Sequence, residues 1–146
     1  MGNSQGLHIA LHAPNLMNVC VDSMNNEVVS GRLYHCYNEE GIAFKNMVQM
    51  LDVMESFYND INYPQASTEV RSFVSNKQTN NSELKKVREQ IDIVEYRGKR
   101  ATFLVHVQYR QNSSWQGQLE WVEKGAVKTF NSELDLVKLI VGALEL

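Results

Sequence analysis

Histidine and cysteine side chains are the groups in this sequence best suited to catalysis or metal binding. They are His8, His12, His35, His106, Cys20 and Cys36. Because His8 and His12 are four residues apart, they would share one face of a helix, as paired zinc ligands do. However, no acidic residue lies between them as in a helical metalloprotease motif, and Pro14 follows closely. The pattern favours ordinary surface histidines, and we expect no metal and no other cofactor.

Cysteine catalysis requires a thiolate and a nearby base. His35 directly precedes Cys36 in a predicted strand, where successive side chains point to opposite faces, so His35 is poorly placed to activate this thiol. Cys20 lies between two valines, which is typical of a core position. Signatures of serine hydrolases, phosphate loops, dinucleotide sites and kinases are missing from the sequence. We therefore expect a protein that is not an enzyme.

Length and charge narrow the class of protein further. The chain has 146 residues, 43% hydrophobic residues and a net charge of −3. This length fits a single domain, 1–146, and the negative charge argues against nucleic acid and anionic membranes as partners. No apolar run approaches the ~20 residues that span a bilayer, and Met1 to Gly6 lack a signal-peptide pattern. We expect a cytoplasmic protein with two reduced, buried thiols.

Hydrophobic periodicity predicts the elements that must position these groups. Alternation predicts strands over 17–23, 27–37, 102–109 and 115–123, with a further short strand ending at Phe130. Asn46 is placed to cap the first of two helical patterns, or that pattern begins a turn earlier. Ser132 caps the second, and Asp135 is placed to complete a capping box. The predicted apolar stripes are Phe44, Met47, Val48, Leu51, Met54 and Phe57 in the first helix, and Leu134, Val137, Val141 and Leu144, broadened by Leu136 and Ile140, in the second.

The middle of the chain is less regular. Residues 83–95 fit either a short helix or the start of a strand. Residues 62–82 have few large apolar side chains, too few to offset the entropy of ordering unless they dock on the body. We expect a mobile excursion there, cut first by proteases near Lys77 to Asn81, to which an acidic partner would bind.

The two ends of the chain align without a gap at an offset of 86 residues. Identical residues in 16–57 and 102–143 are Val19/Val105, Val21/Val107, Asn26/Asn112, Gly31/Gly117, Leu33/Leu119 and Phe44/Phe130. They coincide with strand, turn and glycine positions. This predicts an α+β fold in which a duplicated strand–strand–helix unit forms an antiparallel sheet or open barrel with two main helices on one side. The halves are 16–58 and 102–146, joined by a polar insertion, 59–101. The expected shared core is Leu33, Phe44, Leu51, Leu119, Phe130, Val137 and Val141.

One turn carries a short motif that could bind a ligand. Its run Asn112-Ser113-Ser114-Trp115-Gln116-Gly117 resembles half of the cyclic-di-GMP signature of PilZ domains, which also use an upstream arginine pair. Here Arg97 and Arg100 are spaced one residue shorter than that pair. The resemblance implies a ligand site formed by Arg97, Arg100, Arg110, Asn112, Ser114, Trp115 and Gly117. A turn asparagine and a bulge glycine explain the same pattern without a ligand.

Charge is distributed unevenly along the chain. Residues 71–110 contain nine basic and four acidic residues, a net charge of +5, which leaves −8 for the remainder. Such asymmetry indicates a site for a small anionic ligand or an acidic partner, or else a solvated flank of a linker. Trp115 and Trp121 lie close to this segment in sequence, either as an exposed anchor surface or as core residues.

A second resemblance covers the last third of the chain. The run from Tyr109 to Gly117, then Trp121, then Phe130 and Ser132 before an apolar helix is similar to small uncharacterised proteins of Firmicute bacteria, which implies a bacterial origin.

Taken together, the sequence favours a non-catalytic binding or regulatory module that recognises a protein partner. The alternative is a receptor for a small ligand, for which a cyclic dinucleotide is the candidate.

Overall fold

Six strands and three helices make up the part of the chain that the computed structural model describes, residues 11–26, 28–65 and 85–145. In chain order they are β1 (Met17–Asn25), β2 (Val28–Tyr34), β3 (Ile42–Phe44), α1 (Met47–Ile61), α2 (Gln90–Ile93), β4 (Ala101–Tyr109), β5 (Gln116–Trp121), β6 (Ala126–Phe130) and α3 (Glu133–Leu144).

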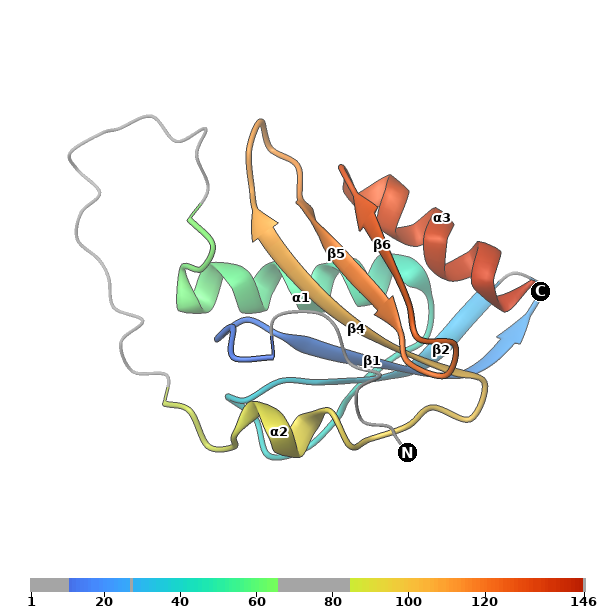
Figure 1. The fold of residues 1–146 in the computed structure, drawn as a ribbon, viewed down its shortest axis with the longest axis horizontal. Helices are drawn as coiled ribbons and strands as arrows, with labels where there is room; N and C mark the ends of the chain where they lie inside the picture. The colour runs from blue at the N-terminus through green and yellow to red at the C-terminus, as the bar shows by residue number, and fades with distance from the viewer. Residues whose placement is uncertain (1–10, 27, 66–84, 146) are drawn as a thin grey trace.

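The strands form one open, fully antiparallel sheet in the order β3-β2-β1-β4-β5-β6 (Figure 1). The fold is therefore α+β, as predicted. Strands β1 and β4 pair at the centre, so the N-terminal strands occupy one side of the sheet and the C-terminal strands the other. β3 and β6 are the two edges. In the N-terminal half the sequence predicted two strands before the helix. The structure adds a third, the three-residue strand β3, which is too short to give a clear alternation.

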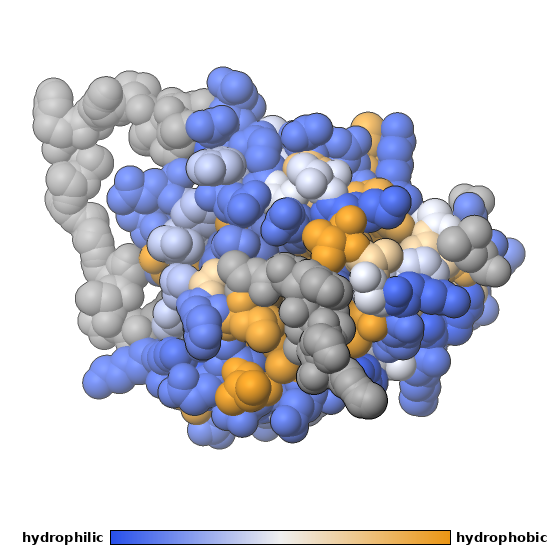
Figure 2. Space-filling view, viewed as in Figure 1, coloured by the Kyte–Doolittle hydropathy of each residue, from blue (hydrophilic) through white to orange (hydrophobic). Residues whose placement is uncertain are grey.

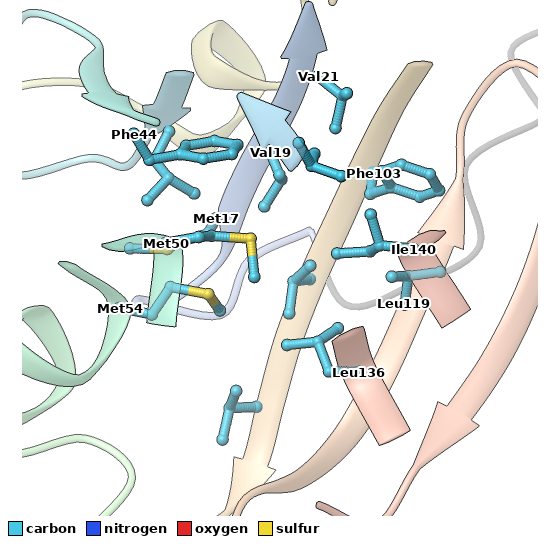
Figure 3. Close-up of a cluster of buried hydrophobic side chains, with 14 of the residues drawn as sticks. Met17, Val19, Val21, Phe44, Met50, Met54, Phe103, Leu119, Leu136 and Ile140 are labelled. Carbon is cyan, nitrogen blue, oxygen red and sulfur yellow. The ribbon is translucent and has the colours of Figure 1, made fainter. Parts of the chain in front are cut away.

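Helices α1 and α3 cover the same face of the sheet and share its main core (Figure 3). From α1 the buried side chains are Met50, Met54, Phe57 and Tyr58, and from α3 they are Leu136, Ile140 and Leu144. In Figure 3 the α1 methionines approach Met17 and Val19 of β1, and the α3 residues approach Phe103 and Leu119. The two helices thus bury apolar side chains on either side of the central strand pair.

The predicted core is confirmed in part. Leu33, Phe44, Leu119 and Phe130 are at most 2% exposed, but Leu51, Val137 and Val141 are only half-buried and Leu134 is 61% exposed. Each helix is apolar along more than one row of side chains, so periodicity did not identify the row that faces the sheet. Contact with the sheet selects the row at strict four-residue spacing, Leu136, Ile140 and Leu144.

The opposite face of the sheet is covered by the segment that contains α2. A second cluster forms there from Leu16, Cys20, Tyr34, Cys36, Ile93, Val94 and Leu104. The Asn18 side-chain amide donates to the Ile93 carbonyl at 2.7 Å, and the Tyr34 and Tyr96 rings stack at 3.8 Å. Figure 2 shows hydrophobic side chains gathered near the middle of one face within a mostly hydrophilic surface. The ambiguous segment 83–95 therefore includes a single-turn helix, and no strand occurs in its described residues.

Both predicted helix caps are confirmed. The Asn46 side chain accepts from the Gln49 amide at 2.8 Å, and the Ser132 hydroxyl accepts from the Asp135 amide at 3.0 Å. In a capping box, the side chain three residues after the cap accepts from the amide of the cap residue itself. Here that side chain accepts from the amide of the residue before the cap. Asp135 accepts from the amide of Asn131 at 3.0 Å, and Gln49 accepts from that of Lys45 at 2.7 Å.

The pairing registers of the two sides agree at an offset of 86 residues. Equivalent Cα partners are Val19↔Leu33 and Val105↔Leu119, then Gly31↔Phe44 and Gly117↔Phe130. A bulge follows Val21 in β1 and Val107 in β4. At the centre, Met17↔Val105 and Val19↔Phe103 lie symmetrically about Asn18↔Leu104. An approximate two-fold axis through this central pair therefore relates the strand pairings on the two sides.

Some expectations concern residues outside the described part of the chain. The mobile excursion over 62–82, with its cleavage region at Lys77 to Asn81, lies almost entirely outside it, and so does His8. Of that excursion only 62–65 are described. Asn62 ends α1 in the left-handed conformation, with φ 54°, and Pro64 is buried.

Candidate functional site

The residues predicted to bind a ligand are divided between two ends of the sheet. Arg97 and Arg100 precede β4, whereas Arg110 and the turn at Asn112 follow it, and a nine-residue strand is roughly 30 Å long. Arg97 donates to the Val94 carbonyl at 2.5 Å, and Arg100 donates to the Leu144 carbonyl at 3.1 Å. The structure therefore does not bring this arginine pair to the turn that carries the motif.

A small polar hollow lies beside the β4–β5 turn. It has a volume of about 200 Å³ and is lined by Glu55, Asn59, Arg110, Ser113, Ser114, Trp115 and Glu133. Arg110 is 6% exposed and donates to the Pro64 carbonyl at 2.6 Å and to the Asn59 side chain at 2.7 Å. Burial lowers the pKa of its guanidinium. The Ser114 hydroxyl donates to Glu133 at 3.0 Å. These donors already have acceptors within the chain.

The other motif residues have structural roles. Asn112 adopts a left-handed conformation, with φ 56°, which the tight turn requires. A Cβ at Gly117 would lie 2.1 Å from the His106 carbonyl oxygen, so close strand approach requires glycine there. Trp115 is 3% exposed and packs edge-on against Tyr58 at 5.3 Å, whereas Trp121 is only partly buried. With two carboxylates in the same hollow, this geometry gives no support to an anion site formed by the seven residues.

A larger hollow opens between α1 and the β2–β3 connection. We call it the α1 hollow. Its volume is about 380 Å³, and its lining is His35, Tyr37, Asn38, Ile42, Asp52, Val53, Ser56, Phe57 and Asp60. Three of its polar residues, Asp52, Ser56 and Asp60, follow one another at four-residue spacing along α1 and are exposed. They therefore form a single stripe along one side of the helix, facing the connection from β2.

His35 forms part of the aromatic wall of the α1 hollow. Its ring stacks on Phe57 at 3.9 Å, and its Nδ1 accepts from the Tyr37 amide at 3.0 Å. Burial lowers the pKa of this imidazole to about 4, so it is neutral at pH 7. Because Nδ1 is an acceptor, Nε2 carries the remaining proton. His35 is thus a neutral, stacked ring rather than a positive charge opposite the two aspartates.

The α1 hollow combines the features that recognise a cation. The partly exposed Tyr37 presents aromatic surface beside the buried Phe57 ring, and Asp52 and Asp60 provide negative charge. Neither carboxylate forms an ion pair with another described residue. Sequence reasoning missed these residues. The spacing of 52, 56 and 60 was visible, but charged positions at this spacing usually mark nothing more than the solvated face of a helix.

Acid should destabilise this protein through His35. Its pKa is lower in the folded chain, about 4, than the usual ~6.5 of an unfolded chain, so protons bind preferentially to the unfolded state. Stability is then fully present above pH ~6.5 and falls as the pH drops toward 4, by up to roughly 3 kcal/mol. Urea unfolding between pH 7.5 and 4 measures this loss. His35→Phe keeps the stacking and should flatten the curve. His106, whose pKa burial also lowers, contributes in the same direction.

The cysteines do not form a nucleophilic site in the described structure. Cys20 and Cys36 are unpaired and buried, and burial raises the pKa of both thiols, that of Cys20 to about 12. His35 stacks on α1 while Cys36 belongs to the cluster on the other face, so base and thiol are separated. The predicted strand over 27–37 was too long, because β2 ends at Tyr34 and both residues follow it. No group of three histidine, cysteine or acidic side chains within the described ranges is placed to hold a metal ion.

These observations define an α+β protein with an open antiparallel sheet, two helices on one face and hollows at the helix flanks. None of the helices in the described part of the chain has the length and apolar character needed to cross a membrane. Comparison of the chain with protein-family models, curated proteins and solved structures finds no match.

Proposed function

We propose that this chain is a non-catalytic binding module that recognises a protein partner, and that the partner inserts a basic side chain into the α1 hollow. The observation that carries the proposal is the aromatic and acidic lining of that hollow. A lysine or arginine places its charge between Asp52 and Asp60 and packs its aliphatic stem against Tyr37.

The hollow suits a protruding side chain better than a flat contact surface. It is concave, and its wall is fixed by the stacked pair His35 and Phe57 and by the hydrogen bond from the Tyr37 amide. A wall that is already ordered loses little conformational entropy on binding. The exposed carboxylates along α1 would also attract a basic segment during the approach of the two proteins.

Nuclear magnetic resonance with peptide pools tests this proposal. Two pools of capped heptapeptides, one containing Lys and Arg and the other Asp and Glu, are added to ¹⁵N-labelled protein. We expect the basic pool to shift the amide resonances of residues 35–42 and 52–60. The double variant Asp52→Asn/Asp60→Asn should bind about three- to tenfold more weakly, as expected for two exposed ion pairs.

The matched control removes the same charge elsewhere. Glu95 and Glu145 are exposed and do not line the α1 hollow, so Glu95→Gln/Glu145→Gln should leave peptide binding unchanged. Equal binding of the acidic pool, shifts confined to other residues, or unaltered binding to Asp52→Asn/Asp60→Asn would each contradict the proposal.

We further propose that the chain arose by duplication of one strand–strand–helix unit. The common offset of 86 residues supports this, because it relates the strand registers, both bulges and both caps. The offset also relates two glycines at which a side chain would clash with the neighbouring strand. A Cβ at Gly31 would lie 1.9 Å from the Cys20 carbonyl oxygen, and a Cβ at Gly117 would lie 2.1 Å from the His106 carbonyl oxygen. A single unit cannot bury its sheet face alone, so two copies side by side give each a shared core.

A further inference from the structure

A second hollow lies under the outer flank of α3, and we call it the α3 hollow. Its volume is about 220 Å³, and it is lined by Phe103, Leu119, Trp121, Ala126, Lys128, Lys138, Leu139, Gly142 and Ala143. The lining is mostly apolar. Gly142 has no side chain, and a Cβ built there would meet nothing within 4 Å, so this helix position leaves space over the hollow.

The charged groups of the α3 hollow have one sign. Lys128 reaches it from β6 and Lys138 from α3, and both are exposed. No acidic residue is part of the lining, and neither lysine forms an ion pair within the described part of the chain. The Lys124 ammonium lies 5.6 Å from the centre of the Trp121 ring, which adds a third positive charge nearby.

The wall of the hollow also contains a polar atom without a partner. The indole Nε1 of Trp121 is buried and forms no hydrogen bond in the structure. A buried N–H without an acceptor costs free energy, and native proteins rarely leave one unpaired. Because solvent does not reach this atom, the charge preference of the hollow rests on the two lysines. The two lysines match an anionic group, and the apolar lining matches a hydrocarbon body.

The α1 and α3 hollows occupy corresponding places in the two halves of the chain. At the offset of 86 residues, six lining positions correspond: His35/Trp121, Ile42/Lys128, Asp52/Lys138, Val53/Leu139, Ser56/Gly142 and Phe57/Ala143. The charge is reversed at one of these positions, because Asp52 of the α1 hollow corresponds to Lys138 of the α3 hollow. The two hollows therefore differ in charge although they occupy corresponding places.

We propose that the α3 hollow binds a small organic monocarboxylate with an apolar body. The carboxylate lies between Lys128 and Lys138, and the hydrocarbon packs against the partly exposed side chains of Trp121 and Leu139. The volume equals that of roughly seven water molecules at about 30 Å³ each, which suits a chain of about eight carbons. An inorganic anion would leave the apolar lining unused, and a neutral hydrocarbon would leave the lysines unused.

Octanoate is the probe that tests this proposal, with octanol and octylamine as neutral and cationic analogues of equal length. Titration into ¹⁵N-labelled protein should move the Trp121 indole resonance, assigned with Trp121→Phe, and the amides of Leu139 and Gly142. Lys128→Gln/Lys138→Gln should weaken octanoate binding about three- to tenfold. Lys45→Gln/Lys99→Gln removes equal charge away from the hollow and should have no effect.

A second variant tests the cavity independently of charge. Gly142→Leu places a side chain over the hollow and should abolish octanoate binding while thermal unfolding shows the protein still folded. The proposal is overturned if octanoate gives no shifts up to about 10 mM, or if octanol or octylamine binds as tightly. Shifts that map to residues outside the hollow, or binding that neither variant weakens, would overturn it as well.

Discussion

Replacing Phe44 or Phe130 by alanine is expected to lower the free energy of unfolding by about 3–5 kcal/mol each. Both rings are at most 1% exposed and lie in the main core. They end the edge strands β3 and β6 at corresponding positions, each paired with a glycine of the neighbouring strand. Truncation removes a large apolar side chain and leaves a cavity that the surrounding strands cannot fill. Urea unfolding monitored by circular dichroism measures the loss.

The matched controls are also related by the offset of 86 residues. Val48→Ala in α1 and Leu134→Ala in α3 truncate apolar side chains that are 69% and 61% exposed, and each should change stability by less than about 0.5 kcal/mol. If both phenylalanine variants lost less than about 1 kcal/mol, the shared core of the two halves would be wrong.

Adding one methyl group at Gly31 or Gly117 should destabilise the protein at least as strongly, by about 3 kcal/mol or more. The new Cβ would lie 1.9 Å from the Cys20 carbonyl oxygen in Gly31→Ala, and 2.1 Å from that of His106 in Gly117→Ala. The obstacle is backbone in a neighbouring strand, which cannot rotate away as a side chain can. Relief therefore requires breaking the strand pairing next to the bulge. The same unfolding measurement applies, together with the dispersion of amide resonances.

Gly142→Ala is the control for this second prediction. A Cβ there meets nothing within 4 Å, and alanine favours a helix over glycine, so we expect a gain of about 0.5–1 kcal/mol. Well-folded Gly31→Ala and Gly117→Ala proteins with stability within 1 kcal/mol of wild type would show that the close strand approach is not required.

Local sequence patterns determined much of this fold. Five of the six strands, the two main helices and the capping roles of Asn46 and Ser132 could be predicted because alternation and side-chain capping are short-range effects. The offset of 86 residues was also visible, and the strand registers follow it. Cys36 and His35 are separated as predicted, but not for the predicted reason, because β2 ends at Tyr34 and both residues lie in the turn that follows it.

Only the tertiary structure decided which apolar row of each helix is buried, that β3 is a strand and that residues 90–93 form a helix. These features depend on contacts between distant residues, such as the bond from Asn18 to the Ile93 carbonyl. The same holds for the sites. Arg97 and Arg100 are near Asn112 in sequence, but β4 carries them to the other end of the sheet. The α1 hollow combines one side of a helix with the connection that precedes it, and the α3 hollow combines α3 with residues of β4, β5 and β6, so the spacing within one element does not reveal either hollow.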